Sequence, residues 1–195
     1  MKLFLKAICA SLICCCIFSM SGFYGACDSI SNEVFRLHIL ADSDSPEDQS
    51  IKLALRDELL SCTAELFTDC SSKDEAVKCA AGKLDEIKAH SEAFLRSRGC
   101  SCPVTVSVTR MPFNTRVYEK FTLPAGEYDA LRVVIGSGRG KNWWCVLYPA
   151  MCFSASGSFG GVMSSGEQEL VSEGEKYEVR FRIVEILESL FSFFR

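Results

Sequence analysis

The sequence is poor in the residues and spacings that most catalytic and metal sites need. Its 195 residues include only two histidines, no C-x-x-C pair and no G-x-S-x-G motif. Structural zinc sites need spaced ligand pairs, and serine hydrolases need a nucleophile elbow, so neither class is expected. Positive charge is not in excess either, because 21 lysines and arginines face 25 acidic residues. Nucleic-acid binding, which needs clustered positive charge, is therefore not expected.

The first 26 residues differ from the rest of the chain. Lys2 and Lys6 are the only charged residues there, an apolar stretch covers residues 7–20, and small residues follow it. A basic start, a short apolar core and a small-residue exit predict a secretory signal peptide. The apolar stretch is shorter than the ~20 residues of a membrane-spanning helix. An uncleaved N-terminal anchor and a buried N-terminal helix stay open as alternatives.

Cys27 follows the small-residue exit directly. It ends the sequence Tyr24-Gly25-Ala26-Cys27, which is similar to a bacterial lipobox, in which the cysteine carries a lipid. Tyr24 stands where that motif has an aliphatic residue. Lipidation of Cys27 and an ordinary cysteine beside a cleavage site are both open.

The pattern after the signal begins with a strand and continues with helices. Residues 34–41 alternate as a strand does, with Leu37 and Ile39 on one face and Arg36 and His38 on the other. A helix is then predicted to begin at Ser45-Pro46, because serine caps a helix and proline suits its first position. A second, amphipathic helix is predicted over residues 72–98, opening on a capping-box spacing.

Strands dominate the second half of the chain. From residue 102 the hydrophobic period changes to two, which predicts a group of three or four strands up to residue 148. Helices followed by grouped strands favour an α+β domain with antiparallel pairing. We predict a single domain over residues 27–195, in which two main helices pack on a mostly antiparallel sheet, followed by a C-terminal helix. Residues 154–175, rich in serine, glycine and glutamate, predict a flexible segment with room for one short helix.

Two segments are similar to ligand sites but have simpler explanations. Gly140-Lys141 suggests a phosphate loop, yet the earlier glycine of that motif is missing and a strand follows, so a hairpin loop is favoured. Asp42, Asp44 and Asp48 suggest calcium, yet two ligand positions of such a loop carry apolar residues, and helix capping explains the aspartates. No cofactor or metal is expected.

The cysteines predict one disulfide bond. Cys145 and Cys152 flank Pro149, which can turn the chain so that the two thiols meet. Cys100 and Cys102 are two residues apart on a predicted strand, ~6.6 Å between Cα atoms, so a bond between them would be strained. Small buried apolar residues are the expectation for the cysteines of the helical region, Cys62, Cys70 and Cys79.

Trp143 and Trp144 are adjacent on a predicted strand, so their side chains face opposite ways. One is expected to pack in the core. The other either lies under a further layer or is exposed as a binding anchor, since tryptophan is enriched in interface hot spots.

Long strings in the chain carry more information than these short motifs. They are residues 36–49, 52–57, 121–136, 140–149 and 152–153, with a short tail at 182–185. Together they resemble the stage II sporulation protein R family, and the resemblance covers about residues 34–186.

The resemblance implies an intercellular signal rather than an enzyme. Members of this family are made in the forespore of endospore-forming bacteria and exported into the space between forespore and mother cell. There they trigger a membrane-embedded aspartic protease of the mother cell, of the stage II sporulation protein GA type, which processes the precursor of the early mother-cell sigma factor. The resemblance assigns no catalytic residue and leaves peripheral membrane association open.

A protein that acts by contact needs a binding surface, and polar residues around a large aromatic suit one. We predict that the surface combines the first strand–helix junction with the loop and strand of the tryptophan pair. Its residues are Arg36, His38, Asp42, Asp44, Asp48, Arg139, Lys141, Trp143 and Trp144. One alternative is structural, with the aspartates capping the helix and both tryptophans buried. Another is an exported hydrolase that uses His38 as general base with an acidic or thiol partner.

Overall fold

The computed structural model describes residues 2–67, 69–118, 121–149 and 163–193. The chain divides into two compact units. The sheet unit comprises Asn32–Pro112 and Glu127–Met163, and the terminal unit comprises Met1–Ser31, Phe113–Gly126 and Ser164–Arg195.

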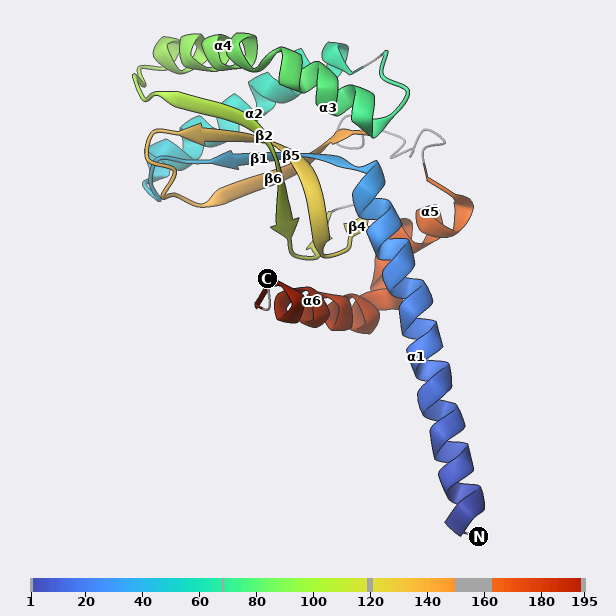
Figure 1. Ribbon diagram of the computed structural model, residues 1–195. Helices are drawn as coiled ribbons and strands as arrows, with labels where there is room; N and C mark the ends of the chain where they lie inside the picture. Colours follow the sequence, from blue (N-terminus) through green and yellow to red (C-terminus); the bar gives the residue numbers. More distant parts are fainter. Residues whose placement is uncertain (1, 68, 119–120, 150–162, 194–195) are drawn as a thin grey trace. The chain divides into compact units, whose positions relative to one another are not determined.

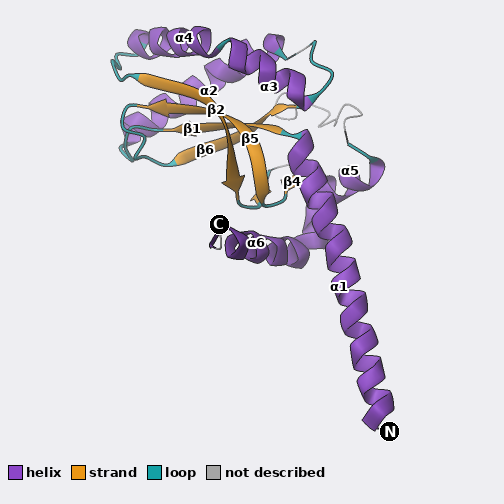
Figure 2. Ribbon diagram, viewed as in Figure 1, coloured by secondary structure: helices purple, strands orange, loops and turns teal. Residues whose placement is uncertain are grey.

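A four-stranded sheet forms most of the sheet unit (Figures 1 and 2). Its order is β2-β5-β1-β6, with β1 at Phe35–Leu40, β2 at Val104–Phe113, β5 at Gly126–Ile135 and β6 at Asn142–Tyr148. Strand β1 runs parallel to β5, where Leu37 pairs with Leu131, and antiparallel to β6, where Leu37 pairs with Cys145. The predicted α+β class is confirmed, with a mixed sheet.

The position of β1 corrects one prediction. Because β1 lies between β5 and β6, these two strands are not hydrogen-bonded neighbours. The loop that joins them, residues 136–141, is therefore not the hairpin loop that the sequence favours. A hairpin requires its two strands to pair with each other, and here a strand from 90 residues earlier in the chain takes that place.

Three helices cover one face of the sheet (Figure 1). They are α2 (Pro46–Leu66), α3 (Lys73–Gly82) and α4 (Leu84–Ser97). Phe35, Leu37 and Ile39 are fully buried on that face and share one core with Leu55 of α2 and Leu95 of α4. Each such side chain contributes about 1.5–3 kcal/mol through burial, so the predicted apolar face of β1 is confirmed and holds the helices on the sheet.

The second predicted helix is two helices. Residues 72–98 form α3 and α4, separated at Lys83, whose φ of −120° and ψ of 17° are not helical. Gly82 ends α3, and glycine costs about 1 kcal/mol in a helix interior. The break lets each short helix aim its own buried residues at the core. Ser72 caps α3 as predicted by accepting a hydrogen bond from the Glu75 backbone N–H.

The terminal unit is built from helices at both ends of the chain. It contains most of α1 (Lys2–Glu33), a small sheet of β3 (Arg116–Val117) and β4 (Thr122–Leu123), helix α5 (Ser165–Ser172), the 3₁₀ turn η1 (Gly174–Tyr177) and α6 (Glu178–Phe193). The predicted C-terminal helix is confirmed by α6. Part of the segment predicted to be flexible is the short helix α5, which a capping box between Ser164 and Glu167 begins.

The predicted signal segment lies inside one long helix. Helix α1 continues without a break through residue 26, so the predicted exit site is helical. Within the described part of the chain, no helix is both long and apolar enough to cross a membrane. Beyond residue 20, α1 buries Phe23, Cys27 and Ile30, which follow a spacing of four and three residues and form one helical face. Cleavage and lipidation at Cys27 stay predictions.

Candidate functional site

The predicted contact surface centres on the junction between β1 and α2. Ser45 caps α2 as predicted, since the Asp48 backbone N–H donates to its Oγ at 3.1 Å. The carboxylate of Asp48 accepts a short hydrogen bond from Ser43 Oγ. Ser45 therefore caps α2, whereas the hydrogen bond from Ser43 to Asp48 joins two side chains and caps no backbone N–H. This corrects the expectation that Asp48 is a capping residue.

The loop of residues 136–141 is hydrogen-bonded to this junction. Asp42 Oδ1 accepts from the Ser137 backbone N–H at 2.5 Å, and Asp44 Oδ1 accepts from the Lys141 backbone N–H at 2.7 Å. The Gly140 backbone N–H donates to the Ala41 carbonyl at 3.0 Å. The hydrogen bonds from Ser137 lower the pKa of Asp42. These hydrogen bonds hold the loop against the junction, and we call residues 42–48 and 136–141 the junction site.

Two glycines make this close approach possible. Gly136 has a φ of +56°, which side-chain-bearing residues rarely adopt, and a Cβ there would lie 2.3 Å from Asp42 Oδ1. A Cβ on Gly140 would lie 2.2 Å from the Ser43 carbonyl oxygen. Both glycines are therefore needed for the close backbone contact between the loop and the junction.

Lys52 is a buried member of the junction that sequence reasoning missed. Its side chain is 3% exposed, and its Nζ donates to Gln49 Oε1 at 2.6 Å and to the Lys141 carbonyl at 2.9 Å. Burial lowers the pKa of the Lys52 ammonium group. The helical spacing could have predicted this burial. Lys52 lies three residues before Leu55 and seven before Leu59, which places it on the buried face of α2.

The side chains that the junction site presents to solvent are mainly charged. Arg139, Lys141 and Asp44 are exposed, and Asp42 and Asp48 are half-buried. Only Arg139 and Lys141 among the predicted residues therefore combine exposure with positive charge. They project from a backbone that the hydrogen bonds to Asp42 and Asp44 hold in place.

Arg36 and His38 lie in the sheet, not at its surface. Arg36 is fully buried, with its guanidinium carbon 4.9 Å from the Tyr128 ring centroid and 6.0 Å from that of Trp144. His38 is 3% exposed, and its ring centroid lies 4.9 Å from that of Trp144. This corrects the expectation that both side chains are presented to a partner, because aromatic rings of β5 and β6 pack over them.

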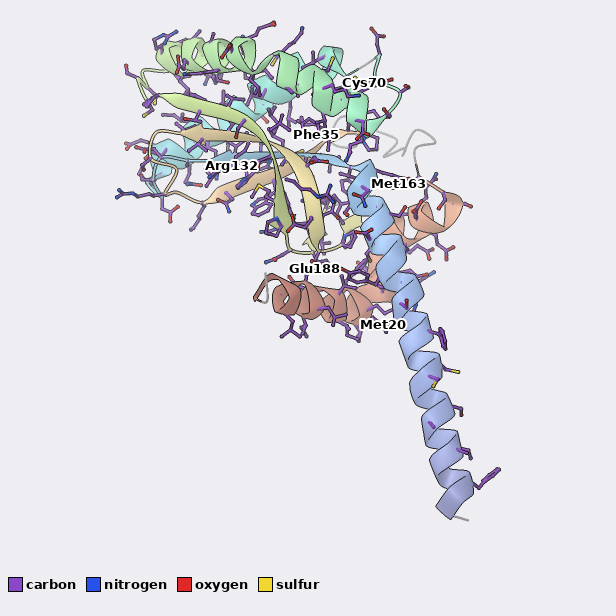
Figure 3. The ribbon with its side chains drawn as sticks, viewed as in Figure 1. Met20, Phe35, Cys70, Arg132, Met163 and Glu188 are labelled. Atoms are coloured by element: carbon purple, nitrogen blue, oxygen red, sulfur yellow. The ribbon has the colours of Figure 1, made fainter. Side chains whose placement is uncertain are left out.

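The environment of His38 favours the neutral imidazole. Burial lowers the pKa of His38 to about 4, and the positive charges of Arg132 and Arg36 lower it as well, against a hydrogen bond with Asn142. Arg132 pairs with His38 across the strands and is labelled in Figure 3. These neighbours are an amide and two guanidinium groups, so none of them is the nucleophile or carboxylate that a hydrolase would place beside its base.

The tryptophans face opposite sides of β6, as predicted. Trp143 is half-buried against the core on the helix side, where the Arg56 guanidinium carbon lies 4.3 Å from its ring centroid. Trp144 is half-buried on the other side, beside His38. Cation–π contacts of this kind add about 0.5–2 kcal/mol, so both rings have structural contacts.

The structure confirms some of the predictions for the cysteines, corrects one and leaves the pairing of Cys145 untested. Cys145 is disulfide-bonded, but Cys152 lies outside the described residues, so their pairing stays a prediction. Cys100 and Cys102 are free thiols, as strain between them predicts. Cys70 and Cys79 are half-buried, whereas Cys62 is exposed and corrects the expectation of burial.

The side chain of Cys27, the predicted lipidation position, is buried. Burial raises the pKa of the Cys27 thiol to about 12, which suppresses the reactive thiolate in this conformation.

In the ranges that the structure describes, no three histidine, cysteine or acidic side chains come together as a metal site. Asp42, Asp44 and Asp48 instead accept hydrogen bonds from the protein itself.

Comparison with known proteins places the sequence among sporulation proteins. The model of the family "Stage II sporulation protein R" matches residues 31–158. A curated relative, "Stage II sporulation protein R" of Bacillus subtilis (strain 168), is 38% identical over 124 residues, which are 64% of this chain and 55% of that protein. The chain therefore spans about half the length of that relative. No solved structure matches significantly.

Proposed function

Because the chain belongs to the stage II sporulation protein R family, we propose that it is an exported sporulation signal that acts by protein–protein contact. In this proposal the forespore exports the protein into the space between forespore and mother cell. There it activates a membrane-embedded aspartic protease of the mother cell, of the stage II sporulation protein GA type. That protease then processes the precursor of the early mother-cell sigma factor. The observation that carries the proposal is the family match over residues 31–158, which includes the whole junction site.

The N-terminal sequence supports the export step. Two lysines, a short apolar stretch and small residues form the pattern of a secretory signal. Mass spectrometry of the exported protein should find a new N-terminus near Cys27 or a lipid on Cys27. An intact Met1 form confined to the cytosol of the producing cell would contradict export.

The junction site is the best-supported contact surface in the sheet unit. Its backbone is fixed by the hydrogen bonds of Asp42, Asp44 and Gly140, so little conformational entropy is lost when a partner binds. Arg139 and Lys141 supply exposed positive charge on that fixed backbone. The exposed carboxylates of Asp44 and Glu47 lie in the same site. The complementary surface of the protease therefore carries charges of both signs, with acidic groups opposite Arg139 and Lys141.

Charge reversal tests this surface in the full chain. We expect Arg139→Glu and Lys141→Glu each to weaken co-purification with the protease at least tenfold and to reduce processing of the sigma-factor precursor in proportion. Thermal melting should stay unchanged, because both side chains are exposed. The matched control is Lys88→Glu, an equal charge reversal at an exposed position of α4. Wild-type binding by both loop variants, or equal loss in the control, would contradict the junction site as the contact surface.

The tryptophan pair is a poorer probe of contact. Trp143 packs on the core and beneath Arg56, and Trp144 packs beside His38. Their replacement by alanine therefore removes stability as well as any surface contact. Among the described residues, those around His38 do not favour the hydrolase alternative, since this side chain is 3% exposed and its neighbours include Arg36, Arg132 and Trp144.

A further inference from the structure

Helix α6 has two apolar faces, and one of them is buried within the terminal unit. Phe181 and Val184 are 2% and 0% exposed. The Phe181 ring centroid lies 5.3 Å from that of Phe23 in α1, and Tyr24 Oη donates to Glu188 Oε1 at 2.6 Å. This inner face accounts for the attachment of α6 to α1.

The opposite face is an exposed apolar stripe. Val179, Ile183, Ile186 and Leu190 are 74%, 39%, 60% and 51% exposed. Their spacing of four, three and four residues places them in one line along the helix. The eleven residue steps from Val179 to Leu190 correspond to about 16 Å along the helix, and an exposed apolar line of this kind is typical of a binding surface.

Arginines border this stripe on both sides. At about 100° per residue, Arg180 lies on one side of the line through Val179 and Arg182 lies on the other. Arg182 is largely exposed and forms an ion pair with Glu185 at 3.2 Å, while Arg180 lies over the rings of Phe23 and Tyr177. An apolar face with basic residues beside it is a feature of helices that lie in a membrane interface. The three glutamates of α6, Glu178, Glu185 and Glu188, lie on the half of the helix away from the stripe.

The orientation of α6 against α1 suits the same environment. Phe23 and Tyr24, neighbours on one turn of α1, contact residues from Tyr177 to Glu188, which span about three turns. Helix α6 therefore crosses α1 instead of running beside it, and Figure 3 labels Met20 and Glu188 near this crossing. Among the described side chains, nine large apolar ones are exposed, and seven of these belong to α1 and α6. On α1 they are Phe4, Ile8 and Phe18.

We propose that α6 lies along the surface of a lipid membrane, with the Val179–Ile183–Ile186–Leu190 stripe in the boundary between headgroups and acyl chains. The two flanking arginines then reach the phosphate groups. In the uncleaved chain, which is the form tested below, the apolar N-terminal part of α1 enters the same lipid layer. The inference does not depend on protease activation, because lipid binding is measured without the protease. It adds a residue-level membrane surface that is separate from the junction site.

The test uses the full chain and vesicles of equal parts phosphatidylglycerol and phosphatidylethanolamine. A hydrophobic diazirine dissolved in the bilayer labels side chains that contact acyl chains, and mass spectrometry maps the labels. We expect label on the peptide that contains Ile183 and Ile186, and we expect Ile186→Glu to remove it. Vesicle affinity should fall at least tenfold in that variant.

A matched control separates the stripe from exposed apolar residues in general. Val117→Glu replaces a side chain of β3 that is 76% exposed, and it should keep both α6 labelling and vesicle affinity. Both variants should melt as the wild type does. Label confined to α1, or equal affinity of Ile186→Glu and wild type, would overturn the proposal. So would a wild-type dimer that Ile186→Glu dissociates without a change in lipid labelling, because the stripe would then bind a second copy of the chain.

Discussion

Acidification should destabilise the protein in part through the side chain of His38. The folded chain holds this imidazole 3% exposed, between the guanidinium groups of Arg36 and Arg132 and against the Trp144 ring. Burial and these charges lower its pKa from 6.5 to about 4. A proton on His38 would add a third positive charge to a site that excludes water.

The size and direction of the effect follow from proton linkage. As pH falls through 6.5, the unfolded chain binds a proton at His38, whereas the folded chain binds it only near pH 4. The contribution is therefore fully present above pH 6.5 and is lost as pH falls toward 4. A difference of about 2.5 pKa units corresponds to about 3 kcal/mol, a large share of the ~5–15 kcal/mol that stabilises a typical domain.

Urea unfolding of the full chain at several pH values between 7 and 4 measures this loss. Carboxylates also titrate in this range, so the informative quantity is the difference between wild type and His38→Gln. We expect the wild type to lose about 3 kcal/mol more than this variant between pH 7 and pH 4. The matched control is His90→Gln, which removes the chain's other histidine, an exposed residue hydrogen-bonded to Glu58. Parallel stability curves for wild type and His38→Gln would refute the reasoning.

Two further substitutions test the packing that the structure shows. Gly140→Ala should lower the free energy of unfolding by about 1–3 kcal/mol, because the new Cβ would lie 2.2 Å from the Ser43 carbonyl oxygen. Urea unfolding measures this loss. The control is Gly82→Ala, where a Cβ has no heavy atom within 4 Å. A Gly140→Ala variant as stable as its control would contradict the tight approach. Phe23→Ala should cost about 3–5 kcal/mol, since Phe23 is 5% exposed and packs on Phe181. Thermal melting checks this against Phe18→Ala, which removes a 78% exposed ring of the same helix, and equal melting of the two variants would disprove the α1–α6 contact.

Local sequence patterns were sufficient to predict individual strands and helix starts. The alternation of Phe35, Leu37 and Ile39 predicts which face of β1 is apolar, because side chains in a strand alternate regardless of what pairs with it. Ser45-Pro46 predicts the start of α2, because a cap depends on atoms within one turn. The long strings shared with the sporulation family identify it for a similar reason, since they are read directly along the chain.

Strand order and side-chain roles depended on residues that are distant in sequence. No local pattern shows that β1 inserts between β5 and β6, because the pairing partners lie about 90 residues away. The same holds for Asp42 and Asp44, which read as capping residues or calcium ligands until their backbone partners at Ser137 and Lys141 are known.

In the candidate site, too, some properties follow from the local sequence and others depend on tertiary contacts. From the sequence, Arg36 and His38 belong to the polar face of a strand, and that face is correct. Whether a polar face meets solvent or is buried depends on what packs on it, and only the tertiary structure brings Tyr128 and Trp144 over these two side chains. Exposure is a property of the folded surroundings, so the sequence determined the face of each residue and the fold decided that Arg139 and Lys141, rather than Arg36 and His38, reach the surface.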